Sequence, residues 1–259
     1  MFKKFILVLL IILFNTSILY ASSHTREKVI FISVATQTEI FWNNIHRLAK
    51  AAAKDLNVDL EIIYTNRNHI KAVEIAKEIA KRKNKPDYVI VVGEKLIASR
   101  SIPALSSSGI KVFLYGDLTK EELEIIGEPR EKYSNYIGKI AIDDYMAGYL
   151  TAEHMVTKAI KQKLQDINGY INFFAFEGVR KTSFSSERVR GLNDVLKKYP
   201  EVRIIQSIAT DWTPKYVEFA LPRLLSRYLK CQVAGIWGAN SALARTSSQI
   251  LIEKGLYPS

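Results

Sequence analysis

Aromatic and hydrogen-bonding side chains follow several apolar segments of this sequence. Phe41 and Trp42 come soon after the first segment, Trp212 follows a later one, and Asn240 ends another. Sugars and polyols present an apolar face of C–H groups and a rim of hydroxyls, so their sites combine aromatic surface with fixed donors and acceptors. An Arg such as Arg188 gives paired hydrogen bonds, and an Asn donates and accepts at once. These residue types indicate a site for a small polar ligand.

Residue patterns typical of catalysis are missing from the chain. The sequence has no H-E-x-x-H, no G-x-S-x-G, no Walker loop and no G-x-G-x-x-G. No two of the four histidines, His24, His46, His69 and His154, stand at metal-ligand spacing, and Cys231 is the only cysteine. We therefore expect no metal site, no cofactor and no enzymatic activity. A cell-wall hydrolase stays open only through the carboxylate pair Glu177 and Asp143.

Predicted strands and helices alternate along the chain, and these elements must position the residues named above. Strands are expected at residues 29–34, 60–64, 88–92 and 112–115, with helices at 41–56, 69–83 and 97–107 between them. A second series gives strands at 136–142, 170–176, 202–208 and 233–237 and helices at 144–163, 187–198, 215–228 and 241–254. Nearly continuous apolar strands between such helices predict parallel sheets covered on both faces.

Two similar series in one chain predict an α/β protein of two doubly wound, Rossmann-like lobes. The irregular, charged stretch around Gly127 and Pro129 is the natural boundary. We expect an N-terminal lobe at 27–118, a crossover or hinge region at 119–139 and a C-terminal lobe at 140–259. Ligands of such sheets bind outside the carboxyl ends of the strands, so two facing lobes would enclose a cleft.

Four segments carry a resemblance to the type I periplasmic binding proteins, in particular the ribose-binding and autoinducer-2-binding group. These segments are residues 37–42 (QTEIFW), 140–148 (IAIDDYMAG), 185–192 (SSERVRGL) and 234–241 (AGIWGANS). The resemblance implies that the ligand-binding residues include Gln37, Phe41, Trp42, Arg188, Trp212 and Asn240. Asp117 is added to them because it ends the fourth strand, where an acidic partner for sugar hydroxyls is expected. Gly116 stands where the family has a ligand-binding polar residue, and Ser241 stands where it usually has Asp.

Five of these assignments have a structural alternative. Phe41 and Trp42 would both be core aromatics at a helix start, and Arg188 would be a surface residue. Asn240 would be the N-cap of the helix from Ser241, a role that is compatible with ligand binding. Trp212 would be a loop residue packed on the lobe surface.

The N-terminus and the charge bear on where the protein works. Residues 1–21 have the basic, apolar and small-residue regions of a secretory signal, with processing expected at Ala21-Ser22 and an uncleaved inner-membrane anchor as the alternative. Both a cleaved signal and an uncleaved anchor predict that the folded domain lies in the periplasm. The formal charge of +11 falls to +9 without Lys3 and Lys4. We interpret this charge as solvated helix faces rather than a nucleic-acid surface.

The resemblance also implies partners and a length. The expected function is that of a monomeric solute-binding protein that delivers a sugar, polyol or autoinducer-2-like ligand to an ABC importer. The alternative is a receptor that presents its ligand to a membrane sensor histidine kinase. The resembled proteins continue after the equivalent of Gly255-Leu256, so we expect the C-terminal lobe to be incomplete and the chain alone to bind ligand weakly.

Overall fold

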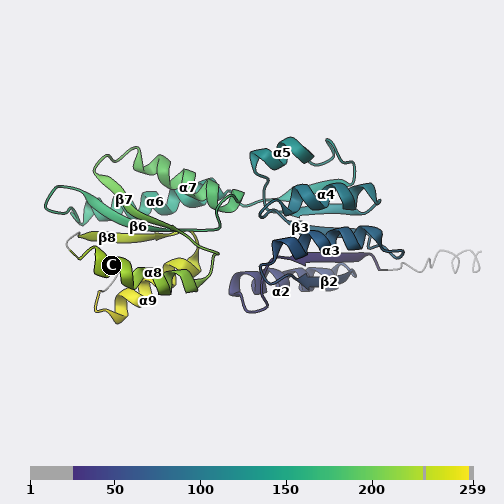
Figure 1. Ribbon diagram of the computed structural model, residues 1–259, viewed down its shortest axis with the longest axis horizontal. Helices are drawn as coiled ribbons and strands as arrows, with labels where there is room; N and C mark the ends of the chain where they lie inside the picture. The colour runs from purple at the N-terminus through teal and green to yellow at the C-terminus, as the bar shows by residue number, and fades with distance from the viewer. Residues whose placement is uncertain (1–25, 230–231, 257–259) are drawn as a thin grey trace, which may run out of the picture.

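The chain folds into two parallel β-sheets, each with helices on both faces (Figure 1). The computed structural model describes residues 26–229 and 232–256. The first sheet has the order β2-β1-β3-β4-β5 and the second the order β7-β6-β8, and every strand pair is parallel. This is the α/β class with two doubly wound lobes that the alternating pattern predicts.

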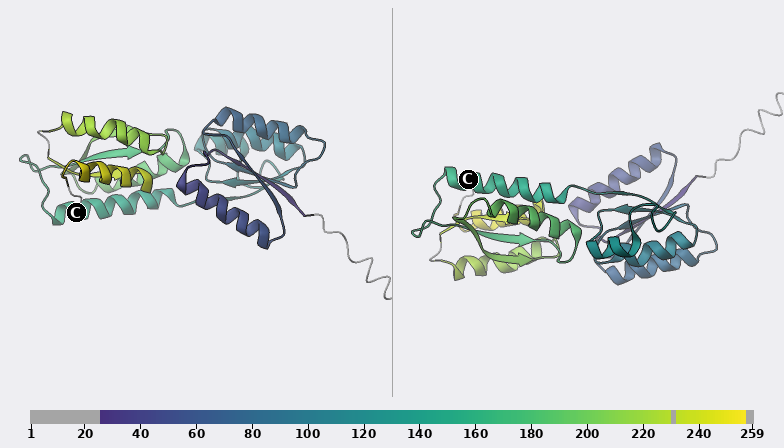
Figure 2. Two further views of the ribbon diagram at one scale, coloured as in Figure 1. Left: turned by 90° about the horizontal axis from the view of Figure 1, so that it is seen from below. Right: turned by 90° about the horizontal axis from the view of Figure 1, so that it is seen from above.

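The first lobe is built from the strands β1 (Lys28–Ser33), β2 (Asp59–Tyr64), β3 (Tyr88–Val92), β4 (Lys111–Tyr115) and β5 (Tyr136–Ile140). Its helices are α2 (Ile40–Asp55), α3 (His69–Lys81), α4 (Ile97–Ser107) and α5 (Lys120–Ile126). Helix α2 covers one face of the sheet, and α3 and α4 cover the other (Figure 2). Because both faces are covered, β3 can be apolar at every position, with Val89, Val91 and Val92 buried.

The second lobe is built from the strands β6 (Ile171–Glu177), β7 (Val202–Ala209) and β8 (Val233–Gly238). Its helices are α6 (Asp144–Lys161), α7 (Ser183–Leu196), α8 (Pro214–Arg227) and α9 (Ser241–Glu253). Helices α6 and α7 lie on one face of the sheet, and α8 and α9 on the other (Figure 1). The central strand β6 supplies the core residues Phe173, Phe174 and Phe176, which are almost fully buried.

The segment 119–139, which the sequence places between the lobes, contains two elements of the first lobe. Thr119 and Glu122 form a reciprocal capping box that starts α5. Strand β5 pairs with β4, and its Tyr136 is completely buried in the first core. Within the described residues the chain therefore passes between the lobes once, at residues 141–143, directly before α6.

Helices α6 and α7 approach each other closely because each has a glycine at the contact. A Cβ atom on Gly148 would overlap the backbone of Arg188, and one on Gly191 would overlap the backbone of Tyr145 and Tyr149. Helix α7 also begins one turn earlier than expected, since the Thr182 hydroxyl accepts a hydrogen bond from the Ser185 N–H at 3.3 Å. These contacts fix Arg188 beside the first turn of α6.

Residues 26–229 and 232–256 contain no helix that is long and apolar enough to cross a membrane. The expected signal segment at 1–21, its processing site and Cys231 lie outside the described residues.

Candidate ligand-binding site

Arg188 is the centre of a charged cluster at the end of the second lobe that meets the first. Its Nε donates to Asp144 Oδ1 at 2.8 Å, its second terminal nitrogen lies 2.7 Å from the same oxygen, and its first terminal nitrogen donates to the Ala239 carbonyl at 2.6 Å. The Asp144 side chain is only 4% exposed. Burial raises the pKa of Asp144, and Arg188 opposes that shift. Arg188 is thus held by three elements, α6, α7 and the end of β8.

Trp212 and Asn240 lie next to this cluster. The Arg188 guanidinium lies over the Trp212 ring, 5.4 Å from its centroid, and the Trp212 backbone has a positive φ of 72°. The Asn240 Nδ2 donates to the Trp212 carbonyl at 3.2 Å, and its Oδ1 accepts from the Leu243 N–H at 2.8 Å as the N-cap of α9. Because the cap uses one amide oxygen lone pair and the Trp212 contact one amide hydrogen, Asn240 retains a donor and an acceptor.

In the first lobe, the two aromatic residues at the start of α2 have different environments. Trp42 is buried in the first core, and its ring lies 5.6 Å from Tyr115 and 6.0 Å from His46. Phe41 is 53% exposed and meets Trp42 edge-on at 5.6 Å. Phe41 is therefore free to stack on a ligand, whereas Trp42 mainly supports Phe41 from behind. We call Phe41 and Trp42 together the aromatic wall.

Tyr115, at the end of β4, was not among the residues selected from the sequence. Its ring lies 5.6 Å from that of Trp42, and burial raises the pKa of its hydroxyl, with smaller effects from Asp144, which raises it, and Arg188, which lowers it. Tyr115 thus extends the aromatic surface of Phe41 and Trp42 to the end of β4. Its position at the carboxyl end of a strand is the signal that sequence reasoning missed.

The remaining two expected residues lie at the first-lobe edge. Asp117 is half-exposed and forms an ion pair with Lys139 at 2.8 Å, and its side chain also accepts a hydrogen bond from the Leu118 N–H at 2.9 Å. Gln37 is exposed on the loop between β1 and α2. The structure therefore brings Arg188, Trp212 and Asn240 together, brings Phe41 and Trp42 together, and leaves Asp117 paired within its own lobe.

A second charged network, which was not predicted from the sequence, joins the loops that follow three strands of the first lobe. Arg67 pairs with Glu39, and its other terminal nitrogen lies 3.5 Å from Glu94. His69 Nε2 lies 3.0 Å from the second oxygen of Glu94, which is 2% exposed. Glu39 also accepts from the Thr36 N–H at 2.9 Å, so this network holds the loop that carries Gln37.

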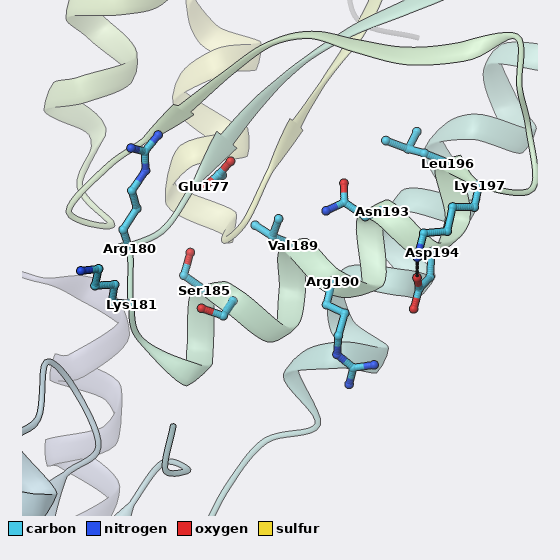
Figure 3. A pocket seen from close by; sticks show the side chains of 11 residues that line it. Glu177, Arg180, Lys181, Ser185, Val189, Arg190, Asn193, Asp194, Leu196 and Lys197 are labelled. Carbon is cyan, nitrogen blue, oxygen red and sulfur yellow. Dashed lines mark hydrogen bonds and ion pairs between the residues drawn. The ribbon is translucent and has the colours of Figure 1, made fainter. Parts of the chain in front are cut away.

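Glu177 and Asp143, the two carboxylates considered above for catalysis, both have structural roles in the fold. The described residues contain no group of three or more His, Cys, Asp and Glu side chains that could hold a metal ion. Glu177 accepts from the Ser207 hydroxyl at 2.5 Å, and Asp143 is the N-cap of α6. A hollow of about 780 Å³ runs along the other side of α7, between Glu177, Arg180 and Lys197 (Figure 3), and none of the expected site residues lines it.

His46 should make the first lobe sensitive to acid. Its ring is buried between Phe31, Trp42 and Tyr64, with Nε2 3.0 Å from the Ser33 hydroxyl and no partner at Nδ1 among the described residues. Burial, and secondarily Lys50, lower its pKa below 6.5, while Glu39 opposes them. The folded state therefore binds fewer protons than the unfolded state below that pH, so the stability that neutral His46 provides above pH 6.5 is lost as the pH falls.

We expect His46→Gln to melt with a smaller loss of Tm between about pH 8 and about pH 5 than the parent protein. Melting followed by circular dichroism measures this difference. His154→Gln is the matched control, because His154 is exposed on α6. An equal acid response in the parent and His46→Gln would contradict the assignment.

Comparison with known proteins places this arrangement in a family. The family model of the periplasmic binding protein domain matches residues 30–258. The chain belongs to the periplasmic binding protein family. No curated protein sequence matches it.

Solved structures of the same fold are similar over nearly all of the chain. A periplasmic sugar-binding protein from Pseudomonas fluorescens has 30% identity and a TM-score of 0.73, over 88% of this chain and 65% of that one. A solute-binding protein from Actinobacillus succinogenes with bound D-allose has 17% identity and a TM-score of 0.73, over 89% and 75%. The arabinose-transporter binding protein from Shewanella sp. ANA-3 has 17% identity and a TM-score of 0.72, over 89% and 70%. The chain thus spans about two thirds to three quarters of these proteins.

Proposed function

We propose that this periplasmic binding protein captures a small neutral polar ligand, such as a sugar or polyol, between its lobes and presents it to the permease of an ABC importer. The observation that carries the proposal is the pairing of two unlike surfaces. Arg188, Trp212 and Asn240 supply donors, acceptors and an aromatic ring from the second lobe, and Phe41 and the Trp42 wall supply apolar surface from the first. An aromatic face opposed to fixed polar groups suits a polyhydroxylated ring.

Charge pairing in this region favours an uncharged ligand. Each cation of this region already has a carboxylate partner: Arg188 pairs with Asp144, Arg67 with both Glu39 and Glu94, and Lys139 with both Asp117 and Glu128. A ligand with a carboxylate or phosphate would have to compete with one of these internal partners, whereas neutral hydroxyls can use the remaining donors and acceptors. The D-allose in the Actinobacillus protein and the L-arabinofuranose in the Shewanella protein are neutral sugars of this kind. The periplasm is the compartment in which such proteins meet their permeases.

Titration calorimetry with pentoses, hexoses, polyols and autoinducer-2, and with the matching sugar acids and sugar phosphates, tests the proposal. We expect at least one neutral compound to bind at least about 10-fold more tightly than its acid or phosphate, a difference of about 1.4 kcal/mol. Phe41→Ala should weaken that binding, while Phe219→Ala, an exposed aromatic of α8, should leave it unchanged. Preferred binding of the anionic compounds would contradict a neutral ligand.

A further inference from the structure

One side chain of the second lobe is part of the hydrophobic core of the first. Phe184 belongs to the first turn of α7, yet its ring packs against the buried cluster of the first lobe, which includes Val112, Leu114 and Tyr136. The preceding residue, Ser183, donates its hydroxyl to the Asp117 carbonyl at 2.8 Å. The N-terminus of α7 therefore connects to the end of β4 by one apolar contact and one hydrogen bond.

The socket that receives Phe184 exists because position 116 has no side chain. A Cβ atom on Gly116 would overlap the Phe184 ring, and the Gly116 backbone has a φ of 111°, which favours glycine. The Gly116 N–H donates to the Ile140 carbonyl at 2.7 Å, directly before the crossing at 141–143. The contact thus lies beside the one covalent passage between the lobes in the described residues.

Phe184 and Arg188 are four residues apart on α7, so they lie on the same face of the helix, one turn from each other. The depth at which Phe184 sits in its socket consequently sets how far Arg188 lies from Tyr115 and the aromatic wall of the first lobe. A single covalent connection of three residues lets two lobes rotate about it, whereas a second, noncovalent contact beside that connection restricts the rotation.

We propose that Phe184 and the Gly116 socket form an interlobe joint that holds the lobes in the orientation in which Arg188 faces the Phe41 and Trp42 wall. Phe184 is a positioning residue, and its consequence for ligand affinity rests on the proposed function. The restriction of lobe orientation does not depend on any ligand.

Pulsed electron spin resonance of the full chain tests the joint without ligand. Spin labels at Lys54→Cys on α2 and Lys215→Cys on α8, with Cys231→Ser, report the distance between two exposed sites on different lobes. We expect one narrow distance distribution in the labelled parent, a broad one in Phe184→Ala and a nearly narrow one in Phe184→Leu, which retains apolar bulk. Phe219→Ala removes an exposed ring from α8 and should leave the distribution unchanged.

A Phe184→Ala distribution as narrow as that of the parent would overturn the joint, and so would equal broadening in Phe219→Ala. If Phe184→Ala does not fold, Phe184→Val gives the same comparison with less broadening, and an unchanged distribution again contradicts the proposal. For a neutral sugar that the parent binds, Phe184→Ala should weaken affinity about 10-fold if the competent orientation becomes about 10-fold rarer. A parent that binds no sugar would contradict the proposed function alone, since the distance measurement needs no ligand.

Discussion

Arg188→Ala is expected to weaken ligand binding by about 30-fold to 1,000-fold, or about 2 to 4 kcal/mol, the range found when a charged partner in a desolvated site is lost. The guanidinium is held by Asp144 and the Ala239 carbonyl, so it needs no reorganisation to meet a ligand. Titration calorimetry of both proteins with the same neutral sugar measures the ratio. Binding within about threefold of the parent would show that the ligand does not contact Arg188.

The same substitution should also reduce stability, because it leaves the Asp144 carboxylate buried without its partner. Removing one member of a buried ion pair costs about 3 to 5 kcal/mol. Burial already raises the pKa of Asp144, and the loss of Arg188 removes the influence that opposes this shift. The folded variant therefore binds a proton more readily than the unfolded chain, and the stability that this proton provides is lost as the pH rises through the raised pKa. The Tm difference from the parent should shrink as the pH falls.

A double variant separates the two effects. Arg188→Met with Asp144→Leu replaces the buried pair by apolar groups, which is often neutral or stabilising. We expect it to recover most of the Tm lost in Arg188→Ala while binding stays weak. Arg190→Ala is the matched control on α7, since Arg190 is 54% exposed and pairs with Glu187 at the surface. A double variant that recovers binding together with Tm would show that Arg188 acts only through stability.

Trp42→Ala is expected to destabilise the first lobe by about 3 to 5 kcal/mol, the usual cost of removing a buried large aromatic side chain. Trp42 is 6% exposed and lies against Tyr115 and His46, so its loss would leave a cavity behind the candidate site. Phe41→Ala should cost little stability because Phe41 is more than half exposed, but about 1 to 3 kcal/mol of binding through lost stacking area.

Urea unfolding of the two variants measures the contrast in stability, and calorimetry measures the contrast in affinity. Leu48→Ala is the control for Phe41→Ala, because Leu48 is a comparably exposed apolar residue further along α2. If Trp42→Ala unfolds at the urea concentration of the parent, the ring contributes less packing than its burial implies. If Phe41→Ala and Leu48→Ala bind equally well, Phe41 does not contact the ligand.

The sequence by itself determined the fold class and the order of the strands and helices, except for α5, which lies in the stretch predicted to be irregular. Apolar segments such as Val29–Val34 and Tyr88–Val92 are short and continuous, and helices with one apolar face separate them, so a parallel sheet covered on both faces follows from local periodicity. The resemblance indicated Arg188, Trp212 and Asn240 as ligand-binding residues, and the structure places them together at the end of the second lobe that meets the first. Whether they bind a ligand stays a prediction.

Only the tertiary structure decided which side chains meet across elements. Trp42 is buried and Phe41 exposed although they are neighbours, because successive helix positions point about 100° apart and only one faces the sheet. Tyr115 lies against Trp42, and Phe184 enters the space above Gly116, through contacts between residues distant in sequence. The membership of β5 in the first sheet could not be predicted from the sequence, because its partner β4 lies about 25 residues earlier in the chain, beyond the reach of local periodicity. The physical reason is that contacts between distant segments depend on how whole elements pack against each other, which the periodicity of one segment does not specify.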